Sequence, residues 1–120
     1  NNYLIAEKFI QAGLYLSSNQ IDKATLIYEE IVKSKNKFYS ILALNTIIEK
    51  DLILDKKKIS NYFTDLEKNI NSKDQKDLLI FKKALYLIKE SDFQKGTNLL
   101  KKISETDSSL KKIAEEILQN

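Results

Sequence analysis

The chain has 120 residues, of which 42% are hydrophobic, and a formal net charge of +3. It contains no cysteine and no histidine, which excludes disulfide bonds, thiolate chemistry and the commonest zinc ligand. All 20 basic residues are lysines, and the absence of arginine disfavours a surface that reads nucleic acid through bidentate contacts.

The chain has no proline and only two glycines, so helices are favoured almost throughout. Apolar residues recur at helical spacing, and Asn, Asp and Ser separate the periodic segments. Asp55, Asp74, Asp92 and Asp107 stand where N-cap residues are expected. The helices predicted in chain order cover residues 3–17, 20–34, 38–50, 55–69, 74–89, 92–103 and 107–118.

The connections between these helices are short, so consecutive helices are expected to form antiparallel hairpins. The first hairpin recurs 72 positions later, where Ala12 corresponds to Ala84, Ala24 to Gly96, and Thr25 to Thr97. A weaker copy lies between them at an offset of about 35. A single hairpin cannot cover its own apolar face, so the same residue sizes are expected to recur wherever hairpins stack.

This pattern resembles the tetratricopeptide class of helical repeat, in which small residues mark the closest helix crossing. The resemblance implies one all-α domain over residues 1–120, a right-handed superhelical stack of antiparallel hairpins. Its three repeats are expected at about residues 3–34, 38–70 and 74–103, with a capping helix at 107–118. The residues that carry the resemblance are Ala12, Tyr15, Ala24 and Tyr28 in the first copy, and Ala84, Leu87, Gly96 and Leu100 in the third.

A narrower resemblance rests on FYSILALNTIIEK at 38–50 and ALYLIKESDFQKG at 84–96, together with Ala24 and Tyr28. These segments are similar to the periplasmic domain of YfgM-type ancillary subunits of the bacterial Sec translocon. The resemblance implies an inner-membrane tether upstream of Asn1 and contacts with exported proteins or periplasmic chaperones. The lack of methionine, even at residue 1, agrees with a removed upstream segment. A cytoplasmic location is the alternative.

No pattern in the sequence predicts a catalytic site. Adjacent acids such as Glu29 with Glu30, and Glu115 with Glu116, point about 100° apart on a helix and do not share a site. Glycine-rich phosphate loops, nucleophile elbows and EF-hand loops are absent from the sequence. We therefore expect a protein that is not an enzyme and that has no cofactor and no metal.

The run Lys56, Lys57 and Lys58, close to Tyr62 and Phe63, is the best candidate for a nucleic-acid contact. Both aromatic residues occupy expected core positions, however, and the lysines fall in the exposed first turns of a helix. We therefore expect no specific nucleic-acid partner, and only weak binding without sequence preference whose affinity falls steeply as salt is added.

The first helix of each predicted hairpin has more apolar surface than one buried stripe requires. In a tetratricopeptide array these helices line the concave face, where another protein, a second subunit or the terminal helix can cover them. Two hypotheses follow, namely an adaptor that binds a protein or peptide and a structural module that forms homo-oligomers. The residues expected on this face are Phe9, Leu16, Ile41, Leu44, Ile48, Phe81, Leu85 and Ile88.

Overall fold

A computed structural model describes residues 2–120, and every regular element in that range is an α-helix. The all-α prediction is confirmed, and none of the helices in these residues has the length and apolar character needed to cross a membrane. The expected tether upstream of Asn1 lies outside the described residues. The helices are α1 (Asn2–Ser17), α2 (Ile21–Lys33), α3 (Tyr39–Glu49), α4 (Lys56–Asn69), α5 (Lys73–Lys89), α6 (Phe93–Ser104) and α7 (Lys111–Gln119).

Two of the four predicted aspartate caps are confirmed. Asp55 accepts hydrogen bonds from the backbone N–H groups of Lys57 at 3.0 Å and Lys58 at 3.3 Å. Asp92 accepts one from the backbone N–H of Lys95 at 3.4 Å. These carboxylates satisfy amide groups that have no acceptor within the first turn of a helix.

The other two cap predictions are wrong. Asp74 lies inside α5, because Ser72 has an extended backbone and caps the helix by accepting from the N–H of Gln75. Asp107 precedes a turn rather than a helix. The hydroxyl of Ser108 accepts from the N–H of Leu110 at 3.1 Å, and α7 starts only at Lys111.

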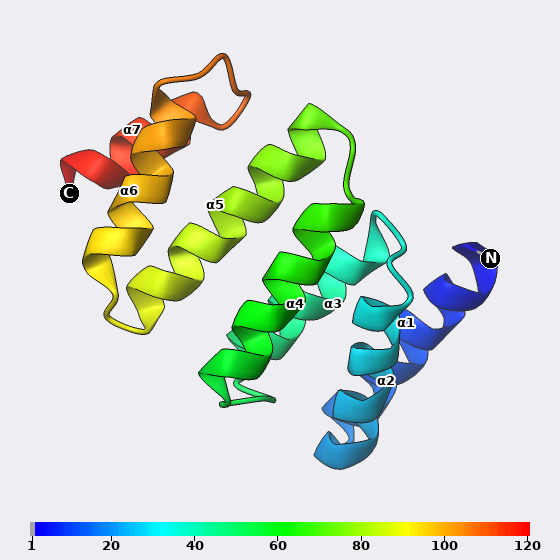
Figure 1. The fold of residues 1–120 in the computed structure, drawn as a ribbon. Helices are drawn as coiled ribbons and strands as arrows, with labels where there is room; N and C mark the ends of the chain where they lie inside the picture. Colours follow the sequence, from blue (N-terminus) through cyan, green and yellow to red (C-terminus); the bar gives the residue numbers. More distant parts are fainter. Residues whose placement is uncertain (1) are drawn as a thin grey trace. The chain divides into compact units, whose positions relative to one another are not determined.

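The chain divides into two compact units, residues 1–69 and 70–120, and Figure 1 shows the path of the helices in each. In the first unit α1 and α2 pair as an antiparallel hairpin, and α3 packs mainly on α2 with a smaller contact on α1. The buried side chains come from all four helices of this unit. They include Ala12, Ala24, Tyr28, Ile31, Leu44, Ile47, Ile59, Phe63 and Leu66.

The second unit contains α5, α6 and α7, with α6 packed against both of its neighbours. Its core consists of Phe81, Ala84, Leu100, Ile103 and Ala114. The predicted capping helix packs on this core through Ile117 and Leu118, together with Leu110 just before it, whereas Ile113 is 44% exposed. The arrangement of all hairpins in one continuous superhelix stays a prediction.

The repeat at an offset of 72 extends to the backbone of the hairpin turns. Asn19 has φ 63° and Ser91, its counterpart, has φ 67°, both in the left-handed region. The N–H of Gln20 donates to the carbonyl of Tyr15 at 2.9 Å, just as that of Asp92 donates to the carbonyl of Leu87 at 2.8 Å. These bonds close the end of the first helix of each hairpin in the same way. The two hairpins are therefore equivalent in turn geometry as well as in residue pattern.

The predicted small residues do lie where the paired helices cross. Ala12, Ala24 and Ala84 are fully buried, and Gly96 is buried as well. A Cβ atom on Gly96 would lie 2.9 Å from the Ala84 carbonyl oxygen and 2.7 Å from the Ile88 Cγ1 atom. Because both distances are shorter than van der Waals contact, α5 and α6 could not approach this closely with any larger residue at position 96.

The two glycines of the chain provide a matched test of this crossing. We expect Gly96→Ala to lower the free energy of unfolding by about 1–3 kcal/mol, because the methyl group overpacks the contact between α5 and α6. Gly13→Ala should instead raise it by about 0.5–1 kcal/mol, since the nearest atom to a new Cβ is the Tyr28 hydroxyl at 3.9 Å and alanine favours the helix. Urea denaturation of both variants measures the difference, and equal stabilities would contradict the crossing.

Candidate functional site

Three of the eight residues predicted to line a concave face are core residues. Leu44 is 1% exposed, Ile41 is 5% exposed and Phe81 is 7% exposed. Phe81 belongs to the core of the second unit, in contact with side chains of α6 and α7. In this conformation the three side chains contact the protein itself rather than a ligand.

The other five predicted residues are half-buried, three in the first unit and two in the second. The ring of Phe9 packs on those of Tyr28 and Tyr39, with centroid distances of 5.8 Å and 5.6 Å. Leu85 and Ile88 pack against the core of the second unit. Ile48 lies in α3. Leu16 lines a groove.

This groove lies where the end of α1, the start of α2 and the connection after α3 meet. Its volume is about 570 Å³. Leu16, Ile21 and Leu52 supply apolar side chains, Gly13 leaves room between them, and Ser17, Lys50 and Asp51 supply polar groups. We call these seven residues the hairpin groove.

The walls of the hairpin groove are fixed by backbone hydrogen bonds at the helix ends. Asp51 has φ 52°, and the N–H of Leu52 donates to the carbonyl of Ile47 at 2.9 Å, which closes α3. Across the groove, the N–H of Gln20 closes α1 in the same manner. Both walls are therefore held by hydrogen bonds within the fold.

Sequence reasoning identified Leu16 but missed Ile21 and Leu52. One pattern could have revealed Ile21, which is 37% exposed at the start of α2. Its counterpart in the repeat, Phe93, is also apolar and is 59% exposed. An apolar position that recurs in both copies without being buried indicates a surface feature rather than a core requirement.

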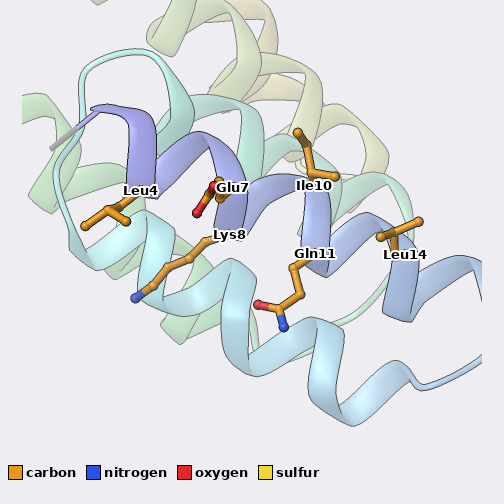
Figure 2. A pocket seen from close by; sticks show the side chains of 6 residues that line it. All are labelled: Leu4, Glu7, Lys8, Ile10, Gln11 and Leu14. Atoms are coloured by element: carbon orange, nitrogen blue, oxygen red, sulfur yellow. The ribbon is translucent and has the colours of Figure 1, made fainter.

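A second apolar surface was also missed in the sequence. On α1, Leu4 is 53% exposed, Ile10 63% and Leu14 65%. Figure 2 shows these side chains on α1 with Glu7, Lys8 and Gln11 among them. Because all six residues come from one helix, this surface is a helix face rather than a cavity. We call it the outer face of α1.

The basic run of α4 takes part in a polar cluster with α2. Glu29 accepts hydrogen bonds from the Lys58 ammonium, at 2.8 Å, and from the Tyr62 hydroxyl. Burial alone would raise the pKa of Glu29, but these two hydrogen bonds and the nearby lysine charges hold it below its ordinary value. Burial, together with the hydrogen bond to Glu29, raises the pKa of Tyr62.

This cluster bears on the candidate nucleic-acid contact. Tyr62 is 6% exposed and Phe63 is 1% exposed, so neither ring offers a free face on which a base could stack. Lys58 is engaged by Glu29. The geometry therefore fits a contact that holds α4 to α2.

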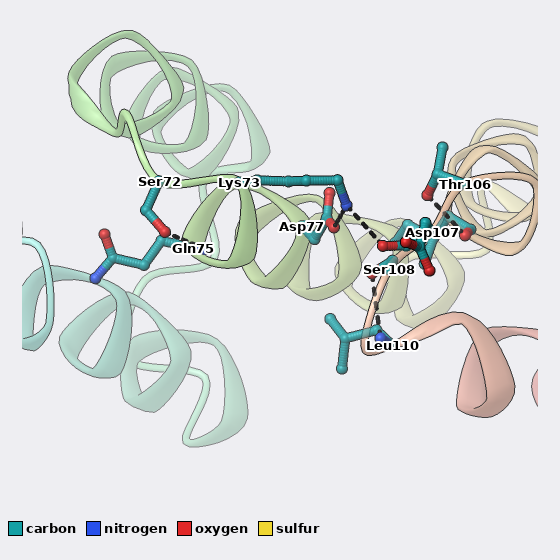
Figure 3. A network of polar contacts seen from close by, with 9 residues as sticks. Ser72, Lys73, Gln75, Asp77, Thr106, Asp107, Ser108 and Leu110 are labelled. Atoms are coloured by element: carbon teal, nitrogen blue, oxygen red, sulfur yellow. Dashed lines mark hydrogen bonds and ion pairs between the residues drawn. The ribbon is translucent and has the colours of Figure 1, made fainter.

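Figure 3 shows a second polar cluster, which anchors the connection between α6 and α7. The ammonium of Lys73 donates to Asp77 at 2.9 Å and to the backbone carbonyl of Asp107 at 3.1 Å. Burial favours a higher pKa for Asp77, but hydrogen bonds from Lys73 and Ser108 lower it overall. Lys73, Asp77 and Ser108 all have partners within the fold, so we assign the cluster a structural role.

The adjacent acids Glu29 and Glu30 do not share a site, as expected. Glu29 faces α4, whereas Glu30 pairs with Lys8 of α1 at 3.0 Å. Across the described part of the chain no group of three metal-ligating side chains comes together. Comparison of the chain with protein-family models, curated proteins and solved structures finds no match.

The two lowered carboxyl pKa values predict a loss of stability in acid. A carboxyl group whose pKa is lower in the folded than in the unfolded chain stabilises the fold above its ordinary pKa, here 4.5 for Glu29 and 3.8 for Asp77. That contribution disappears as the pH falls through the folded-state pKa. We expect the urea midpoint to be flat near neutral pH and to fall below about pH 5.

The substitution Glu29→Gln tests whether Glu29 causes part of this loss of stability in acid. The variant should show a smaller loss of stability between about pH 5 and pH 3 than the parent chain, because residue 29 no longer titrates. Glu115→Gln, at an exposed position on α7, serves as the control and should keep the parent's pH dependence. An identical pH dependence in the parent and Glu29→Gln would contradict the role of Glu29.

Proposed function

We propose that the chain is a non-catalytic protein-binding module in which the hairpin groove takes an apolar or amphipathic segment of another protein. The observation that carries this proposal is the meeting of Leu16, Ile21 and Leu52 around a groove of about 570 Å³ at the end of the first hairpin. Ligand sites commonly have volumes of about 300–1,000 Å³ and combine apolar walls with a few polar groups. The hairpin groove has both properties.

The polar groups of the groove suit a peptide rather than a purely apolar ligand. Ser17, Lys50 and Asp51 line the groove beside the apolar walls. A peptide segment offers carbonyl groups to which the Lys50 ammonium can donate, while one or two of its apolar side chains fill the groove. Burial of those side chains supplies the affinity, and the polar contacts fix the orientation.

The fixed walls support the same proposal. Association is weakened when loops must be ordered as the partner binds. Here the closing hydrogen bonds of α1 and α3 already hold both walls. The groove can therefore bind a partner without first reorganising its own backbone.

The repeat supports a finer proposal about architecture. We propose that the hairpins form a tetratricopeptide-like solenoid, a class of fold that serves chiefly for protein recognition. The matched turns and crossings at an offset of 72 agree with it. The resemblance to YfgM-type proteins extends the proposal to an adaptor tethered at a bacterial inner membrane, in contact with exported or chaperone proteins in the periplasm.

Substitution of the groove side chains tests the proposed function. Peptides that bind the parent chain are first selected from a displayed random library. Their affinity is then measured by isothermal titration with the double variant Ile21→Ser, Leu52→Ser. We expect binding to weaken at least about tenfold, because the variant loses apolar contacts with the bound segment. Leu26→Ser is the control, since Leu26 is equally apolar and 63% exposed on α2 but lies outside the groove.

The thermodynamics of peptide binding provide a second readout. Apolar burial predicts a negative heat-capacity change and an affinity that persists at high salt. Circular dichroism should show that the helical content of the groove variant equals that of the parent. Peptides that bind the groove variant as tightly as the parent would contradict the assignment of the groove.

A further inference from the structure

The outer face of α1 has a spacing of apolar and polar side chains that is the same in both directions. Leu4, Glu7, Gln11 and Leu14 follow one another at intervals of three, four and three residues, which places them along one stripe of the helix. The two leucines lie at the ends and the two polar residues in the middle.

The positions of these residues are spaced evenly about the level of Phe9, although the central and flanking residues of each pair differ in type. Leu4 and Leu14 lie five residues to either side of it, Glu7 and Gln11 lie two residues away, and Lys8 and Ile10 lie one residue away. We infer that this face binds the same face of a second copy of the chain, with the two α1 helices antiparallel. A two-fold axis requires such a self-complementary surface.

Each contact along the stripe of this pairing joins groups that suit one another. Leu4 packs on Leu14 of the second copy, and the symmetry repeats this contact at the other end. Between them the Glu7 carboxylate accepts a hydrogen bond from the Gln11 amide of the second copy, again twice. The apolar ends supply attraction, and the polar centre supplies the register.

The flanks of the stripe fit the same arrangement. Ile10 lies on one side of the stripe and Lys8 on the other. In an antiparallel pair the same side of both helices comes together, so Ile10 faces Ile10 of the second copy. On the other side the two Lys8 residues approach each other, but each ammonium is held by Glu30 of its own chain at 3.0 Å. Each flank therefore presents an apolar side chain or a neutralised pair, and unpaired like charges do not meet.

The parallel orientation of the two helices is disfavoured by the same residues. It would place Glu7 against Glu7 and Gln11 against Gln11, which brings two carboxylates together at an interface from which water is partly excluded. Antiparallel pairing replaces that repulsion with two hydrogen bonds between a carboxylate and an amide. The polar centre thus selects the orientation.

Packing within the hairpin does not account for Leu4 and Ile10. At the corresponding positions of the repeat, Leu4 is replaced by Lys76 and Ile10 by Lys82, whereas Leu14 is matched by Tyr86. The position of Glu7 is taken by Leu79, which is fully buried, so the two copies differ in what covers this face. Leu4 and Ile10 are therefore apolar additions to what the hairpin itself requires.

The area of this surface limits the affinity of the dimer. A helix of 16 residues is about 24 Å long, and one face of it is smaller than the roughly 800 Å² per partner of a standard stable interface. The dimer is therefore weak and reversible, and it forms at high protein concentration.

Sedimentation equilibrium of the parent chain, from roughly ten micromolar to one millimolar, measures the association. The parent should show a monomer–dimer equilibrium. The double variant Leu4→Lys, Ile10→Lys carries the lysines found at the corresponding positions of α5, and it should dissociate at least about tenfold more readily because apolar contacts are lost. Leu26→Lys, at an equally exposed apolar position on α2, should dimerise as the parent does.

The orientation is tested by disulfide cross-linking, for which the cysteine-free sequence is well suited. Chains with Leu4→Cys and chains with Leu14→Cys are mixed and oxidised. Antiparallel pairing predicts mixed disulfides in excess of the statistical share. A chain that is monomeric at every concentration, a dimer that survives Leu4→Lys, Ile10→Lys, or a predominance of like-with-like disulfides would each overturn the inference.

This inference is independent of the proposed function, which concerns the hairpin groove. The groove variant Ile21→Ser, Leu52→Ser should still dimerise, and Leu4→Lys, Ile10→Lys should still bind the selected peptides. A monomeric parent that binds those peptides would overturn the dimer alone. A dimeric parent whose selected peptides bind the groove variant as tightly as they bind the parent would overturn the groove alone.

Discussion

The close crossing of paired helices is the constraint on which the rest of the structure depends. Where Ala84 meets Gly96, the backbones approach until even one additional carbon atom would collide with a carbonyl oxygen. Such an approach brings the larger neighbours, such as Leu100 and Ile103, into one continuous core. It also determines which side chains remain outside that core, and both surfaces proposed to bind protein consist of such side chains.

Much of the fold could be predicted from the sequence because helix spacing and small residues are local patterns. The boundaries of α1 to α6 agree with the prediction within one residue at each end. The start of α7 was missed because Asp107 has the chemistry of an N-cap, while the side chain that turns the chain there is that of Ser108. The sequence shows that a cap is available, whereas the neighbouring packing decides which residue provides it.

The candidate site was harder to predict, and the reason is geometric. Apolar periodicity separates one face of a helix from another, but it does not distinguish a side chain packed on a neighbouring helix from one that faces solvent. Ile41 and Leu44 therefore looked like ligand contacts although they are buried. Conversely, Leu52 follows a helix and belongs to no periodic pattern, so only the backbone turn at Asp51 brings it beside Leu16 and Ile21.

The packing of each helix mainly on its neighbours in sequence has a consequence for how the chain folds. Within each unit the principal contacts join consecutive helices, such as α1 with α2 and α5 with α6. Contacts between residues close in sequence form quickly, because little chain entropy is lost before they become favourable. The first hairpin can therefore assemble as soon as its two helices have left the ribosome, before the residues that will form α5 to α7 have been synthesised.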